Sequence, residues 1–106
     1  MEKISKRKAK KLKLMAEEAT VDCHNEDEQF SGWECTLNDE LPLPLKCRIF
    51  DEEALLVRIC MDESGRSILG TIKKGNKKIR IPIQDLKPAS QKAAEWIEAY
   101  RIWLSC

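Results

Sequence analysis

Apolar side chains in the first half of the chain recur with the period of an α-helix. The residues concerned are Phe30, Trp33, Leu37 and Leu41. Their separations of three, four and four positions place them on one helical face. The pattern predicts a helix that runs to about Asn38, because Pro42 and Pro44 follow and hold the chain in an extended conformation.

From residue 45 the apolar period changes to two, which is the period of a strand with one buried face. Four such segments are separated by polar turns, at residues 45–49, 54–60, 67–74 and 77–83. Gly75 followed by Asn76 is typical of a tight hairpin, and Gly65 can supply the positive φ of a turn. The pattern predicts an antiparallel meander of four to five strands, which can curl into a small SH3-like half-barrel.

Helical periodicity returns in residues 91–104, after a helix start marked by Pro88 and Ser90. The apolar positions there are Ala93, Trp96, Ile97, Tyr100, Trp103 and Leu104. We expect the aromatic side chains to close one end of the sheet as part of the core. The predicted fold is α+β, a small antiparallel sheet flanked by an acidic N-terminal helix and an amphipathic C-terminal helix.

The formal net charge of +1 conceals two unlike segments. Residues 1–14 carry seven Lys or Arg against one Glu, whereas the rest of the chain carries twelve against seventeen acidic residues. The basic segment is expected to be partly disordered at its start and helical from about Lys8. A length of 106 residues suits one domain, so we predict a basic extension at residues 1–19 and a single domain at residues 20–106.

Cysteine usage and the lack of long apolar runs indicate the compartment. The five cysteines, at positions 23, 35, 47, 60 and 106, are odd in number and form no Cys-x-x-Cys pair. We therefore expect reduced thiols and a cytoplasmic protein, without a signal peptide or a membrane span. We do not expect an enzyme, because His24, the one histidine, adjoins Cys23 and adjacent residues do not normally form a nucleophile–base pair.

Acidic side chains are concentrated between Met15 and Glu40, a stretch with nine carboxylates and no Lys or Arg. Calcium prefers six to eight oxygen ligands from carboxylates, amides, backbone carbonyls and water. The candidate ligands are Asp22, Asn25, Glu26 and Glu28 at the predicted helix entrance, and more loosely Asp39 and Glu40 at its far end. The acidic turns at residues 51–53 and 62–63 could approach either group.

The same residues also suit a helix N-terminus that binds no metal. Asp22 or Asn25 can serve as the N-cap, and acids in the first turn interact favourably with the helix dipole. Capping accounts for one or two of these acids, so the sequence leaves both interpretations open.

The run VDCHNEDEQFSGWECTLNDELPLPLKCR, residues 21–48, resembles the opening of the small bacterial calcium-binding proteins of the CcbP type. The matching positions are Asp22, Glu26 to Glu28, Gly32-Trp33, Leu37, Leu41 and Leu43-Pro44-Leu45. The later IPIQDLKP and AAEWIEAYRIW resemble the end of that family. The resemblance spans roughly residues 20–104 and implies a calcium-binding buffer or sensor with a small barrel and helices but no EF-hand. Departures include His24, Glu34, Cys35 and Thr36, where the family usually has aromatic residues.

A nucleic-acid-binding barrel is the alternative function. Basic residues surround the third hairpin, namely Lys73, Lys74, Lys77, Lys78 and Arg80, and the basic N-terminal segment could add phosphate contacts. Against this alternative, no predicted strand carries an aromatic pair on which bases could stack. From the acidic segment and the family resemblance, we expect calcium ions as the partner. Nucleic acid is a partner only under the alternative, and any protein partner is unknown.

Overall fold

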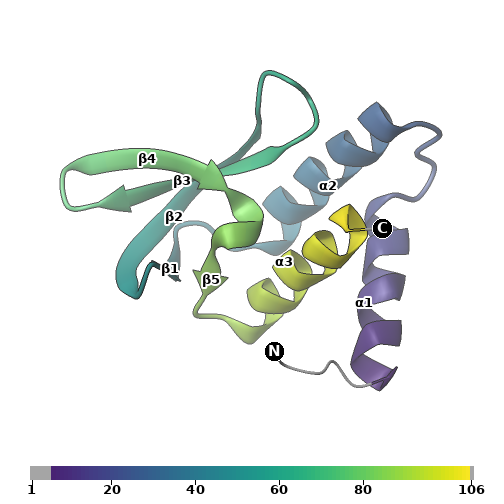
Figure 1. Ribbon diagram of the computed structural model, residues 1–106, viewed down its shortest axis with the longest axis horizontal. Helices are drawn as coiled ribbons and strands as arrows, with labels where there is room; N and C mark the ends of the chain where they lie inside the picture. Colours follow the sequence, from purple (N-terminus) through teal and green to yellow (C-terminus); the bar gives the residue numbers. More distant parts are fainter. Residues whose placement is uncertain (1–5, 106) are drawn as a thin grey trace.

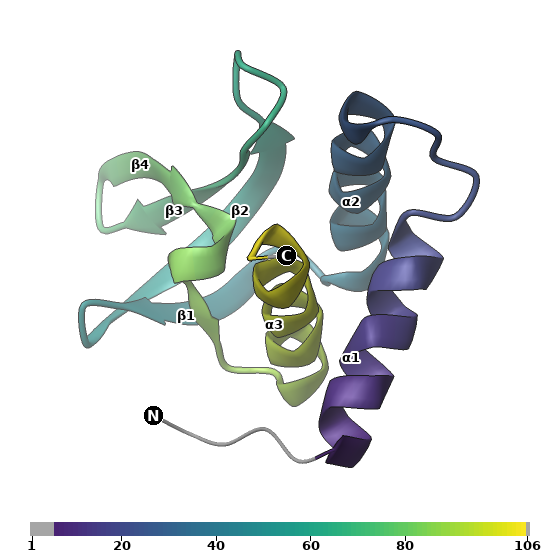
Figure 2. The same cartoon turned by 45° about the vertical axis from the view of Figure 1, so that its right-hand side comes forward.

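Two helices cover one face of a five-stranded antiparallel sheet, and a third helix packs on their far side (Figures 1 and 2). This arrangement is seen in a computed structural model, which describes residues 6–105. The helices are α1 (Lys6–Ala19), α2 (Glu26–Glu40) and α3 (Gln91–Leu104), and a 3₁₀ turn, η1, spans Ile83–Asp85. The strands are β1 (Leu45–Ile49), β2 (Glu52–Met61), β3 (Ile68–Lys74), β4 (Lys77–Pro82) and β5 (Lys87–Pro88).

The strands follow the order β4-β3-β2-β1-β5, so the sheet is open with β4 and β5 at its edges. The predicted α+β fold with a four- to five-stranded meander is confirmed. The first hairpin turn differs from the prediction, because β2 already begins at Glu52 and the turn consists of Phe50 and Asp51. Both have positive φ, 49° and 63°, as a two-residue turn between twisted strands requires. The period-two pattern of residues 77–83 predicts a buried face there, but Ile79 on the edge strand β4 is 48% exposed.

Helix α2 begins where the sequence predicts. Asn25 is its N-cap, and the Oδ1 atom of Asn25 accepts a hydrogen bond from the Glu28 amide at 2.8 Å. The helix continues through Glu40, two residues beyond the predicted end. Leu41 caps its C-terminus, where the Leu41 amide donates to the carbonyl of Leu37. The stripe of Phe30, Trp33 and Leu37 is buried, as the spacing predicts.

Aromatic side chains fill the space between α2 and α3. Trp33 of α2 is fully buried and lies 5.3 Å from Tyr100 and 6.3 Å from Trp96, both of α3, measured between ring centroids. Phe30 meets Trp103 edge to face at 5.0 Å. The aromatic residues of α3 are therefore core, as predicted, but they pack against α2 rather than at one end of the sheet. Edge-to-face contacts of this kind add to the stabilisation from apolar burial.

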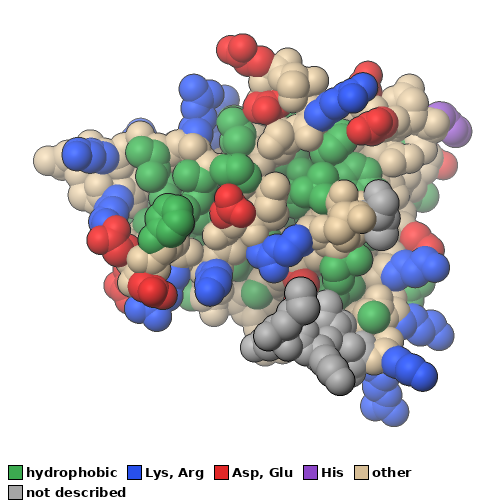
Figure 3. All heavy atoms as spheres, viewed as in Figure 1, with side chains coloured by type: hydrophobic (Ala, Val, Ile, Leu, Met, Phe, Trp, Pro, Cys, Tyr) green, Lys and Arg blue, Asp and Glu red, His purple; other side chains and the backbone are tan. Residues whose placement is uncertain are grey.

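Helix α1 packs across α3 and the start of α2. Its Leu12 and Ala19 are buried, with 1% and 4% of their surface exposed. Lys8 and Lys11 form ion pairs with Glu98 and Glu95 of α3, at 3.2 Å and 2.8 Å. The remaining basic side chains face outward and gather at the lower right of the space-filling view, over α1 (Figure 3). Leu12 and Ala19 belong to the same hydrophobic core as α2, α3 and the sheet. The division into an extension at residues 1–19 and a domain at residues 20–106 stays a prediction.

Two further features bear on the sequence predictions. The four cysteines in the described part of the chain, Cys23, Cys35, Cys47 and Cys60, are free thiols. Among residues 6–105, no helix is long and apolar enough to cross a bilayer.

Candidate metal centre

The connection between α1 and α2 carries the first candidate ligands. A turn closes it, in which the Thr20 amide donates to the carbonyl of Ala16 and the Cys23 amide donates to that of Thr20, each at 3.1 Å. Asp22 lies within this turn, between Thr20 and Cys23. Its backbone has a positive φ of 60°, and its side chain is exposed. The tight turn therefore presents the Asp22 carboxylate to solvent at the amino end of α2.

Asn25 and Glu28 cap α2 reciprocally. Asn25 accepts from the Glu28 amide, and the Oε2 atom of Glu28 accepts from the His24 amide at 2.8 Å. The pair resembles a capping box, but Glu28 accepts from the amide of His24, one residue before the N-cap, and not from that of Asn25. One oxygen of each group is thus engaged by the protein itself. The capping interpretation, which the sequence left open, describes what these two side chains do here.

Glu26 and Asp27 lie in the first turn of α2, and both are exposed. Glu26 borders an open hollow of about 550 Å³ between the start of α2 and the end of α3. One wall of the hollow is polar and the other contains Phe30, Trp103 and Leu104. The single histidine, at the upper right of Figure 3, marks this end of the molecule, and acidic side chains lie near it.

Asp39 and Glu40 lie at the other end of α2. A helical rise of about 1.5 Å per residue places Asp39 roughly 20 Å from Glu26. Glu40 forms an ion pair with Lys92 of α3 at 3.3 Å, and the thiol of Cys35 is 4.0 Å from the Oδ2 atom of Asp39. The structure therefore does not bring these two acids together with Asp22, Asn25, Glu26 and Glu28.

Within residues 6–105, no group of three or more His, Cys, Asp or Glu side chains converges in a way that could hold a metal ion. The acids at the start of α2 supply the right atoms for a hard cation, since carboxylate and amide oxygens suit calcium. Their side chains are exposed and can turn, and no Lys or Arg lies between residues 14 and 45 to neutralise them. The donor chemistry of these residues fits calcium.

One acidic residue outside the predicted ligand set connects α2 to the sheet, and a second shapes the turn beside it. Glu34, on the buried side of α2, accepts a hydrogen bond from the Met61 amide at the end of β2. Asp62 follows directly and accepts from the amide and hydroxyl of Ser64, which shapes the β2–β3 turn. Both ribbon views show this turn rising next to α2 (Figures 1 and 2). Glu34 could have been noticed from its position between Trp33 and Leu37 on an otherwise apolar stripe.

The basic residues of the alternative function lie on the β3–β4 hairpin but do not share one face. Lys73 pairs with Lys78 and Lys74 with Lys77, so the two pairs point to opposite sides of the ribbon. Lys74 forms an ion pair with Glu52 of β2. Arg80 lies opposite Thr71. The hairpin is thus less concentrated in positive charge than the sequence alone indicates.

Comparison with known proteins gives a consistent result. A protein-family model of the CcbP type, described as calcium binding, matches residues 13–104. The fold is similar to the crystal structure of CcbP from Anabaena, with a TM-score of 0.75 and 14% identity over 98% of this chain and 94% of that one. It is also similar to a structure described as a calcium-binding protein in its calcium-binding form, with a TM-score of 0.72 and 15% identity over 95% and 91% of the two chains. No curated protein matches the sequence. None of these matches supports the nucleic-acid alternative.

Proposed function

Because the chain belongs to the CcbP-type family of calcium-binding proteins, we propose that its exposed acidic segment, residues 22–28, holds the calcium ion. One observation carries the proposal: the turn after α1 and the cap of α2 together present the side chains of Asp22, Glu26, Asp27 and Glu28 at the surface without a basic neighbour in sequence. Such carboxylates repel one another, and a divalent cation removes that repulsion.

Each candidate ligand has a distinct part in this proposal. Asp22 and Glu26 are exposed, and no hydrogen bond to their side chains is seen in the described residues, so both can turn fully toward an ion. Glu28 keeps one carboxylate oxygen on the His24 amide and can offer the other. The Oδ1 atom of Asn25 has a second lone pair beyond the one used by the Glu28 amide. Water and backbone carbonyls would complete the shell.

Asp39 and Glu40 are proposed as a second, weaker site. The ion pair of Glu40 with Lys92 must be given up before Glu40 can bind calcium. The loss is small at an exposed pair, but it lowers the affinity relative to the segment 22–28.

We assign a buffering role rather than a sensing role to the protein. A sensor needs an element with two arrangements that calcium can bias. Beneath the acidic segment, Trp33, Leu37 and Tyr100 are completely buried and interlocked, and α2 is tied to β2 through Glu34. Calcium binding at the surface of such a core would order side chains locally. The absence of enzymatic activity and a cytoplasmic location remain predictions.

Isothermal titration with calcium tests the ligand assignment, with magnesium as the competing ion. The double variant Asp22→Asn, Glu26→Gln is expected to lower calcium affinity at least tenfold. The double variant Glu52→Gln, Glu53→Gln is the matched control, because it also removes two exposed carboxylates, here from the start of β2. Equal affinities for the two double variants would refute the assignment to residues 22–28, while leaving calcium binding itself in place.

A further inference from the structure

The face of the sheet that the helices leave uncovered is strongly basic. Residues paired across antiparallel strands point to the same face, so the strand register arranges this face in rows. One end row, of Cys60, Leu69 and Pro82, is apolar, and the other three rows contain the charged side chains. These three rows are Lys87, Arg48 and Glu53; then Lys46, Leu55, Lys73 and Lys78; then Arg58, Thr71 and Arg80. Seven of these ten residues are Lys or Arg, one is acidic, and all except Thr71 are exposed. We refer to these ten residues as the basic face.

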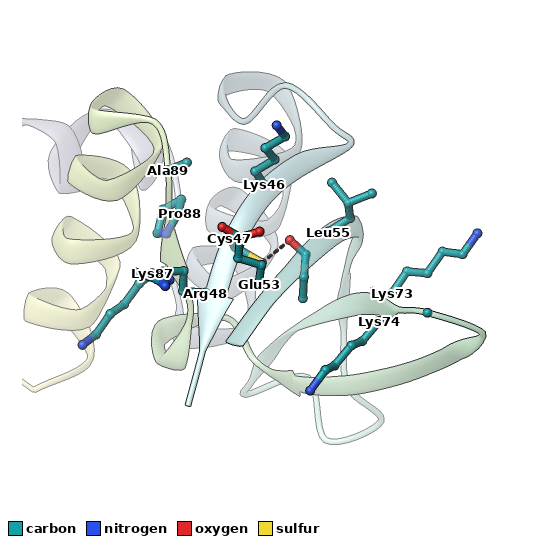
Figure 4. Close-up of a pocket in the computed structure, with 12 residues that line it drawn as sticks. Lys46, Cys47, Arg48, Glu53, Leu55, Lys73, Lys74, Lys87, Pro88 and Ala89 are labelled. Atoms are coloured by element: carbon teal, nitrogen blue, oxygen red, sulfur yellow. Dashed lines mark hydrogen bonds between the residues drawn. The ribbon is translucent and has the colours of Figure 1, made fainter. Parts of the chain in front are cut away.

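Two hollows indent the basic face. One, of about 560 Å³, lies over β1, β2 and β5 and is bordered by Lys46, Arg48, Leu55 and Lys87, among others. The second, of about 660 Å³, lies over β2, β3 and β4 and includes Arg58 and other residues of the third row. Figure 4 shows Lys46, Leu55 and Lys73 rising on the same side of neighbouring strands, with Arg48 and Glu53 close together at the centre. An extended ligand could therefore cross several strands in contact with positive charge.

We infer that the basic face docks an acidic segment of a partner protein, one that carries an apolar anchor residue among its carboxylates. Seven cations on one face, most of them separated by less than two strand spacings of about 4.8 Å, lie within a Debye length of their neighbours and repel one another. The single carboxylate of the basic face, that of Glu53, does not offset the repulsion among seven cations. A polyanionic segment would, and it would be steered to the face by its charge. The inference does not depend on where calcium binds.

Two features of the basic face favour a peptide over a nucleic acid. Leu55 stands in the middle row between Lys46 and Lys73, and 37% of it is exposed. A leucine there suits an apolar side chain rather than a phosphate. None of the ten residues is aromatic, so bases would find no stacking platform there.

Fluorescence anisotropy with a labelled nonapeptide of the sequence EEEELEEEE tests the inference, on the full chain in EDTA at low salt. The wild-type protein is expected to bind this peptide saturably and not to bind SSSSLSSSS. Lys73→Glu should weaken binding at least tenfold and Lys73→Gln about threefold. Leu55→Ser should weaken it about threefold. Lys10→Glu is the matched control in α1, where the same charge change on an exposed helix should leave the affinity unchanged.

Other results would overturn the inference. No saturable binding of the acidic peptide would refute docking of an acidic segment. An equal loss with Lys10→Glu and Lys73→Glu would mean that net charge alone, and not the basic face, determines binding. Tighter binding of oligouridylate, unaffected by Leu55→Ser, would make the face a nucleic-acid surface. A dimer in sedimentation velocity that Lys73→Glu abolishes would identify a second copy of this chain as the occupant. Circular dichroism establishes for each variant that the fold is intact, and Lys73→Gln serves if Lys73→Glu fails that check.

Discussion

Gly32 of α2 lies against the last turn of α1, so closely that a Cβ atom at this position would be 2.5 Å from the carbonyl oxygen of Ala19. The same atom would be 3.0 Å from the sulfur of Cys23. A backbone oxygen cannot yield as the tip of a flexible side chain can. The contact between α1 and α2 therefore requires glycine, and it fixes the connection that carries Asp22.

Gly32→Ala is expected to destabilise the protein by roughly 1–3 kcal/mol, as overpacking of a well-packed contact usually does. The higher helix propensity of alanine, worth about 1 kcal/mol, opposes part of this loss. Urea denaturation measures the change in the free energy of unfolding. Ser31→Ala, next in the chain and exposed, is the control and should be neutral or slightly stabilising. A more stable Gly32→Ala variant would show that α1 does not pack here as described.

Substitutions of Asn25 can separate its structural role, as the N-cap of α2, from its proposed role as a calcium ligand. Asn25→Ala deprives the Glu28 amide of its acceptor and should cost about 1 kcal/mol of unfolding free energy. Asn25→Ser retains a capping oxygen and should recover most of that loss. If Asn25 is also a ligand, the serine variant will still bind calcium more weakly than wild type. Thermal denaturation of both variants measures the loss of stability, and calcium titration of both measures the loss of calcium affinity.

Tyr100, the one tyrosine of the chain, provides a clean pH-dependent signal. Burial raises the pKa of Tyr100 from 10.0 to about 12, and the Asp62 carboxylate adds to the increase. Between these two values the unfolded chain releases a proton that the folded protein retains. The free energy of unfolding should therefore fall as pH rises from 10 to 12, by roughly 3 kcal/mol at most from this group.

Ultraviolet absorbance of the tyrosinate follows this titration directly. Tyr100→Phe keeps the ring and should remove this contribution to the alkaline loss of stability, with the titration of other groups unchanged. A Tyr100 hydroxyl that titrates near 10 in the folded protein would contradict its burial between α2 and α3.

The ion pair between Glu40 and Lys92 predicts how the second site responds to mutation. Lys92→Gln frees the Glu40 carboxylate and removes a nearby positive charge, so calcium affinity at Asp39 and Glu40 should rise. Stability should change by less than about 1 kcal/mol, because the pair is exposed. Calcium titration at low salt measures the effect. An unchanged second binding step, or none in either protein, would remove Asp39 and Glu40 from the ligand set.

Local sequence signals predicted most of the elements. The Asn25 cap, the stripe of α2 and the Gly75-Asn76 turn each follow from neighbouring residues. A turn was predicted at residues 51–53, but its restriction to Phe50 and Asp51 was not recognised, because neither is the glycine or asparagine that positive φ favours. Strand β5 has two residues, too few to show a period.

Contacts between distant residues were beyond the sequence. Nothing local indicates that Glu34 meets the Met61 amide or that Gly32 meets Ala19. The basic face likewise depends on register, since its residues come from all five strands. For the candidate site, the sequence indicated the residue types and their separation, and the structure added which oxygens the cap already uses.

The most direct test of the central claim is a calcium titration followed by the backbone amide resonances of the labelled protein, at physiological salt with magnesium as control. The account predicts saturable shifts that begin in residues 22–28, survive excess magnesium and leave the amides of β1 to β4 nearly unmoved. Shifts centred on Asp62 and the β2–β3 turn, or equal shifts with magnesium, would contradict a calcium site at the start of α2.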